Sequence, residues 1–76
     1  MNTRISVDPA IHFGKPCIRN TRIPVYEVLA LVRGGLSFEK ILVDYYPSLK
    51  EEDIQACLQY AMDVMEAEDL HVQMGA

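Results

Sequence analysis

Three cations and several turn-forming residues gather in one short run, GKPCIRNTRIPV, at positions 14–25. Proline fixes φ and lacks an N–H, while Gly and Asn tolerate positive φ, so the run predicts a stiff, bent loop. Arginine suits bidentate contacts with phosphate, and a rigid loop lowers the entropic cost of binding. The run therefore predicts a DNA-contacting loop, with candidate residues Lys15, Arg19, Asn20, Thr21 and Arg22.

The same residues have a structural interpretation. Arg19 or Arg22 can brace the loop against Asp8 or against an acid on a helix. Asn20 and Thr21 are typical turn-shaping and capping residues, and this role is favoured for them over contact with bases. Replacing the arginines separates the two interpretations: DNA contact predicts weaker binding with an intact fold, and bracing predicts a damaged fold.

No catalytic group is predicted elsewhere. His12 and Cys17 are near enough in sequence for a thiol–imidazole pair, but no orienting acid accompanies them. Asp8, His12, His71 and the scattered acids lack metal-ligand spacing, so neither a metal nor a cofactor is predicted. Cys57, between Ala56 and Leu58, is expected in the core. Without C-x-x-C spacing, both cysteines are expected to be reduced thiols of a cytoplasmic protein, and we expect no enzyme.

Charge divides the chain into two unlike parts. Residues 1–35 carry five Lys or Arg against two acids (+3), and residues 36–76 carry two against nine (−7), which sum to the net charge of −4. The pattern indicates a basic binding end and an acidic tail. The tail is amphipathic and predicts a partner-binding helix, as in helix-in-groove recognition, with candidate residues Met62, Met65, Glu66, Asp69 and Leu70. Its apolar face can equally pack on its own core or on a twin subunit.

Local signals predict a hairpin followed by three helices. Residues 5–7 alternate and precede the turn signal Asp8-Pro9; the pairing strand is expected near 17–18 or 22–23. A first helix is expected from Pro24 to the glycines at 34–35, with an apolar face at 25, 28, 29 and 32. A second is expected from the N-cap Ser37 to Pro47, and a third from a Ser48–Glu51 capping box to about Leu70.

These elements predict a mainly α, compact tri-helical domain of helix-turn-helix proportions with a short N-terminal β-hairpin. The predicted single domain, residues 1–76, divides into a basic arm (1–23), a three-helix region (24–70) and a frayed tail (71–76). A domain of 76 residues is marginal alone, and half its residues are apolar, so a homodimer or a hetero-complex is expected. No apolar run approaches the roughly 18 residues of a membrane span, and no signal-peptide core is present at the start.

The start of the third helix argues against ordinary major-groove binding. In a helix-turn-helix, the first residues of the second helix face the bases. Here that helix begins with Glu51, Glu52 and Asp53, whose carboxylates repel phosphate. If the chain binds DNA, the basic loop is expected to make most of the contacts, with steep salt dependence.

The run at 14–25 resembles the signature of the domain-of-unknown-function 433 family. The resemblance extends to Asp8-Pro9, to residues 35–37 and 41–42, and to the stretch YPSLKEEDI at 46–54, so it covers roughly residues 5–62. Two positions depart from the family pattern: Phe13 precedes Gly14 where a second glycine is usual, and Asn20 stands where glycine is usual. Asn is the next-best residue for a left-handed backbone, so the bend is expected to survive.

The resemblance implies a homeodomain-like helical fold and a predicted VapB-type antitoxin. A protein of this kind binds a PIN-like ribonuclease toxin and, together with it, operator DNA. The alternative we retain is a small dimeric protein-interaction module with no DNA role.

Overall fold

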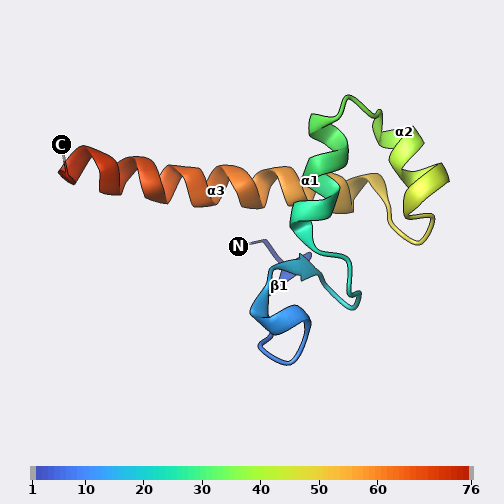
Figure 1. Ribbon diagram of the computed structural model, residues 1–76, viewed down its shortest axis with the longest axis horizontal. Helices are drawn as coiled ribbons and strands as arrows, with labels where there is room; N and C mark the ends of the chain where they lie inside the picture. Colours follow the sequence, from blue (N-terminus) through green and yellow to red (C-terminus); the bar gives the residue numbers. More distant parts are fainter. Residues whose placement is uncertain (1, 76) are drawn as a thin grey trace.

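Three helical regions and a two-stranded antiparallel sheet make up the molecule (Figure 1). The computed structural model describes the backbone of residues 2–75 and the side chains of residues 2–67. This agrees with the predicted mainly α chain with an N-terminal hairpin. In chain order the elements are β1 (Ile5–Ser6), η1 (His12–Gly14), β2 (Cys17–Ile18), α1 (Val25–Arg33), α2 (Phe38–Lys40), η2 (Ile41–Tyr45) and α3 (Glu51–Gly75).

The hairpin uses the first of the two expected pairing segments. Ile5 lies opposite Ile18, and Ser6 lies opposite Cys17. An isolated bridge then joins Cys17 to Pro24, which leads the chain from the sheet directly into α1. Two short strands are not stable alone in water. Here Ile5 and Ile18 are both buried in the core shared with the helices.

The first predicted helix is confirmed, with a start one residue later than expected. Pro24 is extended (φ −69°, ψ 141°) and caps α1 instead of forming its first turn. At the other end, Gly35 has φ +91°. The N–H of Leu36 reaches the carbonyl of Leu31 and that of Gly35 reaches Val32, which is a Schellman ending. The expected glycine stop is therefore correct.

The second predicted helix is replaced by two shorter segments. A regular α-helix was expected up to Pro47, but α2 has three residues and continues as the five-residue π-helix η2. The wider turn closes with the N–H of Tyr46 on the carbonyl of Ile41. Tyr46 then leaves helical geometry, as a residue before proline tends to do. Its hydroxyl donates to Glu27 on α1 at 2.9 Å. Burial, followed by Glu27, raises the pKa of Tyr46 to about 12.

The third helix begins differently from the prediction. It starts at Glu51, so Lys50 and not Ser48 precedes its first turn. Asp53 reaches back and accepts the N–H of Lys50 at 2.9 Å, the role that a Glu or Gln plays in a capping box. The predicted pair Ser48–Glu51 was therefore two positions too early. The helix also continues to Gly75, beyond the end expected at Leu70.

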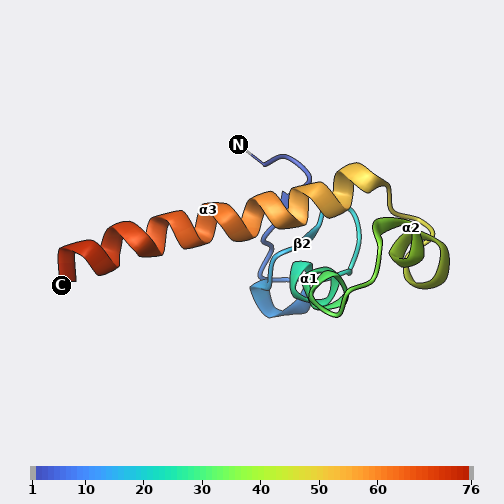
Figure 2. The same cartoon turned by 90° about the horizontal axis from the view of Figure 1, so that it is seen from above.

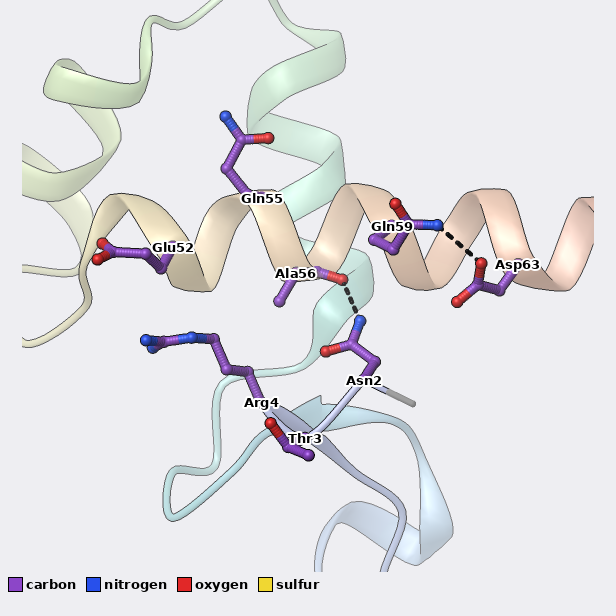
Figure 3. A pocket seen from close by; sticks show the side chains of 8 residues that line it. All are labelled: Asn2, Thr3, Arg4, Glu52, Gln55, Ala56, Gln59 and Asp63. Carbon is purple, nitrogen blue, oxygen red and sulfur yellow. Dashed lines mark hydrogen bonds between the residues drawn. The ribbon is translucent and has the colours of Figure 1, made fainter.

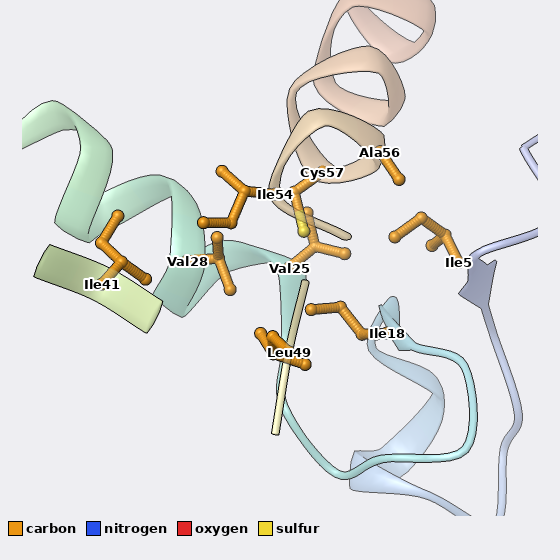
Figure 4. Packing of buried hydrophobic residues seen from close by; sticks show 9 residues of the cluster. All are labelled: Ile5, Ile18, Val25, Val28, Ile41, Leu49, Ile54, Ala56 and Cys57. Carbon is orange, nitrogen blue, oxygen red and sulfur yellow. The ribbon is translucent and has the colours of Figure 1, made fainter. Parts of the chain in front are cut away.

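The core lies where the hairpin, α1, η2 and the first turns of α3 meet (Figure 4). Val28, Ile41, Ile54 and Cys57 are fully buried within it. The expected core position of Cys57 is confirmed, and burial raises the pKa of its thiol to about 12. The whole cluster consists of Ile5, Ile18, Val25, Val28, Ile41, Leu49, Ile54, Ala56 and Cys57.

The rest of α3 leaves this core behind. The molecule measures 44 × 31 × 20 Å, and α3 follows its longest axis in both views (Figures 1 and 2). From Met62 to the last described side chain, every residue of α3 is exposed. We call residues 62–75 the α3 arm. Packing of the arm on its own core, one of the sequence alternatives, is thereby excluded for Met62 and Met65.

Candidate functional site

Of the five predicted DNA-contacting residues, Lys15 lies before β2 and the other four lie in or beside a tight turn directly after it. The N–H of Thr21 donates to the carbonyl of Ile18 at 3.0 Å, and Asn20 has φ +64°. Positive φ at the third position of a turn is the type II pattern, which Asn tolerates. The Thr21 hydroxyl donates to Ile18 at 2.7 Å and accepts from the N–H of Ile23 at 3.0 Å. Asn20 and Thr21 therefore shape this turn, as the structural interpretation expected.

Arg19 holds the N-terminal segment to the loop. Its Nε donates to the carbonyl of Thr3 at 2.6 Å and its Nη2 to that of Ile5 at 3.2 Å. Its backbone N–H donates to the intervening carbonyl, that of Arg4, at 2.7 Å. One residue thus binds three consecutive carbonyls. The sequence suggested a brace against an acid, whereas the actual partners are backbone oxygens.

Lys15, before β2, and Arg22, after it, are both exposed cations. Among residues 2–67, ion pairs join Arg4 to Asp53 and Lys40 to Asp44, so neither Lys15 nor Arg22 has a carboxylate partner there. These two side chains therefore remain available to an anion. Of the five predicted DNA-contacting residues, Arg19 and Thr21 use their side chains in bracing and in the turn, and Asn20 is committed to the turn through its backbone.

A polar hollow of about 580 Å³ separates the N-terminal segment from α3 (Figure 3). Asn2 donates to the carbonyl of Ala56 at 2.7 Å, and Gln59 donates to Asp63 at 2.8 Å. Arg4, which also lines the hollow, pairs with Asp53 at 2.9 Å, and Asp53 also accepts the N–H of Lys50. The polar residues around the hollow thus mainly hold the N-terminal segment against α3.

An apolar groove of about 670 Å³ lies on another side, between α1 and α3. Pro24, Val25 and Leu29 contribute from the start of α1, and Tyr60, Ala61, Val64 and Met65 contribute from α3. The loop before β2 adds His12 and Lys15 at its edge. Tyr26, Val64 and Met65, which line this groove, are 77%, 41% and 55% exposed. Such a surface is typical of a binding groove for a protein segment.

The predicted partner-binding residues lie on the α3 arm. Met62 is 57% exposed and Met65 55% exposed, and Glu66 is exposed beside them. Because successive helical residues turn by about 100°, Met62 and Glu66 face away from Val64 and the groove, and Met65 lies between the two faces. The structure therefore divides the predicted set over two sides of the helix. The side chains of Asp69 and Leu70 lie outside the described residues.

The two cysteines are buried, and the possible metal-binding side chains are scattered. Cys17 is 1% exposed and Cys57 is fully buried. Among the described residues, no group of three or more His, Cys, Asp or Glu is arranged to hold a metal ion. The described helices include none that combines the length and apolar character needed to cross a membrane.

Fold and surfaces define a small helical domain with a β-hairpin, an apolar groove and a projecting terminal helix. The chain belongs to the family described as "Protein of unknown function (DUF433)", whose model matches residues 5–61. It is 42% identical over 57 residues to the uncharacterized protein y4eO of Sinorhizobium fredii, covering 75% of this chain and 25% of that protein. The chain thus spans about a quarter of this curated relative.

A solved structure shares the fold. The crystal structure of a DUF433 member from Anabaena variabilis superposes with a TM-score of 0.74 at 33% identity, covering 92% of this chain and 68% of that one. The predicted family is therefore confirmed.

Sequence reasoning missed Asn2, Arg4 and Asp53 as the residues that join the two ends of the domain. Arg4 and Asp53 are 49 positions apart, so no local pattern links them. The groove was also missed, because its residues come from three separate segments.

Proposed function

We propose that this protein is the antitoxin-like component of a type II toxin–antitoxin system and acts in the cytoplasm by binding a PIN-like ribonuclease. The observation that carries the proposal is the α3 arm, a helix that continues beyond the core with Met62 57% exposed. An amphipathic helix projecting from a small domain is suited to lie in a groove of another protein. The resemblance of the sequence to predicted VapB-type antitoxins suggests the class of partner, a PIN-like ribonuclease.

The acidic character of the arm supports a ribonuclease as the partner. The arm, residues 62–75, contains four acids and no Lys or Arg. A protein that cleaves RNA needs a positively charged surface to hold the phosphates. An acidic helix carrying an apolar residue such as Met62 competes with RNA for such a surface. Neutralisation then follows from occupation of the substrate site.

Isolation of the protein with its partners from the native host tests this proposal. We expect a PIN-like ribonuclease to accompany the wild-type chain in stoichiometric amount, and Met62→Asp to weaken that association. Val43→Asp is the matched control, because Val43 is 67% exposed on η2, away from the arm. If the chain is isolated without any ribonuclease, the proposal that it binds a toxin is contradicted.

A role in DNA binding for autoregulation is the second part of the proposal. It is favoured by two exposed cations: Arg22 follows a turn held by hydrogen bonds of Thr21, and Lys15 lies before β2. In the helix-turn-helix interpretation, α2 and η2 together form the first helix of the motif, and α3 is the recognition helix. The acids Glu51 and Glu52 at the start of α3 oppose that docking, so we assign the phosphate contacts to the loop. The alternative is a small dimeric protein-interaction module, which has neither a DNA role nor the task of neutralising a toxin.

A further inference from the structure

The α3 arm presents two thioethers to solvent. Met62 is 57% exposed and Met65 is 55% exposed, and these are the methionines whose side chains the structure describes. Residues three apart on a helix are neighbours, so both side chains belong to one surface of the arm. A thioether does not ionise, so the exposure of the side chain governs how readily an oxidant reaches its sulfur. Both methionines are therefore open to oxidation in the folded chain.

The two thiols of the chain are shielded from the same oxidant. Cys17 is 1% exposed, Cys57 is fully buried, and neither is in a disulfide. The thiolate is the form of cysteine that reacts, and burial raises the pKa of Cys57 to about 12, so this thiol stays protonated at neutral pH. An exposed thiol with a pKa of about 8.5 is partly ionised there and would react first. Folding thus directs an oxidant to the methionines.

We infer that Met62 and Met65 are a site of reversible oxidation by hydrogen peroxide, and that the α3 arm releases its protein partner when they are oxidised. A lone pair on the sulfur attacks one peroxide oxygen, so an S–O bond forms and the O–O bond breaks. The other oxygen leaves as hydroxide and takes the proton of the transferred oxygen to become water. The sulfur loses two electrons and becomes a sulfoxide. The release of the partner rests on the proposed function.

The sulfoxide changes the contact surface and spares the core. It is polar where the thioether is apolar, and burying a polar group without a hydrogen-bond partner costs free energy. Neither methionine belongs to the buried cluster, so the domain stays folded when they are oxidised. Methionine sulfoxide reductases reverse the change: a dithiol supplies two electrons and becomes a disulfide, and the oxygen leaves as water.

Mapping of the oxidised residues in the purified full chain tests the site. At about pH 8, hydrogen peroxide should add one oxygen each to Met62 and Met65, while Cys17 and Cys57 stay free thiols. Mass spectrometry after alkylation in denaturant measures both. In the urea-unfolded chain at the same pH the order should reverse, because the thiols are then exposed and partly ionised. Oxidation of either cysteine ahead of the methionines in the folded chain would overturn the inference.

The variant Met62→Leu with Met65→Leu tests the release of the partner. Leucine is apolar and a good helix former, but it carries no sulfur. Only the chain is treated, and catalase removes the peroxide before the ribonuclease is added. Treatment should weaken binding by the wild type about tenfold and binding by the double variant less than about twofold. A methionine sulfoxide reductase with dithiothreitol should restore the wild type.

The outcomes separate this inference from the proposed function. The double variant keeps Met1 and Met74, so an equal loss of binding in both treated proteins would place the effect elsewhere and overturn the inference. If the oxidised wild type binds as well as the untreated chain, the inference fails and the proposed function stands. If the untreated chain binds no ribonuclease, the proposed function fails and the release fails with it, whereas the mapping still decides the oxidation site.

Discussion

Arg19 is best understood as part of the fold. Its guanidinium and its backbone N–H bind the carbonyls of Thr3, Arg4 and Ile5, which ties the N-terminal segment to the turn at Asn20. An arginine in a basic loop is easily assigned to DNA from the sequence alone. The sequence could not choose, because the carbonyls that Arg19 binds lie 14 to 16 positions away.

Arg19→Ala should therefore lower the free energy of unfolding by about 1–2 kcal/mol, since it leaves carbonyls without charged donors. Arg19→Lys should recover only part of this, because one ammonium cannot reproduce the fork of donors. Urea unfolding measures both. Arg22→Ala on the same loop is the control and should change stability by less than about 0.5 kcal/mol. Equal effects of Arg19→Ala and Arg22→Ala would contradict the brace.

Because the thiol of Cys57 is buried, we expect the folded protein to lose stability at alkaline pH. Burial raises the pKa of its thiol from 9.0 to about 12, so the unfolded chain releases the proton before the folded chain does. A raised pKa gives stability that is complete below the unfolded value and is lost as pH rises towards the folded value. The melting temperature of the wild type should fall between about pH 9 and about pH 11. Cys57→Ala should be less stable at neutral pH but fall less steeply, and parallel curves would contradict the assignment.

At the scale of elements, the start of α3 joins the two ends of the domain. Asp53 accepts the N–H of Lys50 and pairs with Arg4, so one carboxylate caps the helix and holds the N-terminal segment. The sequence placed the helix and its acidic first turn correctly but assigned the cap to Ser48. Lys50 is not a usual capping residue, so the local pattern favoured Ser48 and Glu51 over the pair that the structure uses.

Asp53→Ala should lower the free energy of unfolding by about 2 kcal/mol, because it removes the cap and leaves Arg4 without its partner. Asp53→Asn keeps an acceptor oxygen for the Lys50 N–H and should lose less. Glu52→Ala is a control at an exposed neighbouring carboxylate. Thermal or denaturant unfolding compares the three, and a Glu52→Ala effect as large as that of Asp53→Ala would refute the role of the cap.

At the scale of the molecule, local signals predicted the hairpin, the ends of α1 and the existence of α3. They missed the π-helical η2, whose wide turn closes with the N–H of Tyr46 on the carbonyl of Ile41, because the sequence pattern does not separate this turn from an α-helical one. They also could not tell that Ile54 enters the core while Met62 and Met65 leave it, because the same spacing continues through α3. The candidate surfaces show the same limit. Individual exposed residues could be predicted from the sequence, but which of them lie together on one surface could not.

Binding of DNA by the basic loop should depend steeply on salt. Removing a side chain that binds one phosphate reduces the slope of log K against log salt by about one. Lys15→Ala and Arg22→Ala should each lower the slope by about that amount, with unchanged helical circular dichroism. Fluorescence anisotropy over a salt series measures this slope. Lys40→Ala is the control, because Lys40 on α2 is already paired with Asp44 on η2. Absence of binding at low salt, with and without the ribonuclease, would contradict the DNA role.

The central claim is that the α3 arm binds and neutralises a ribonuclease. Titrating the purified chain into its co-purified PIN-like ribonuclease, with RNA cleavage as the readout, tests it most directly. Wild type and Val43→Asp should abolish cleavage at equal stoichiometry, whereas Met62→Asp should need about tenfold more protein, as loss of an interface anchor costs more than about 1 kcal/mol. Cleavage that continues unchanged in excess wild-type chain, or inhibition equally strong with Met62→Asp, would contradict the account.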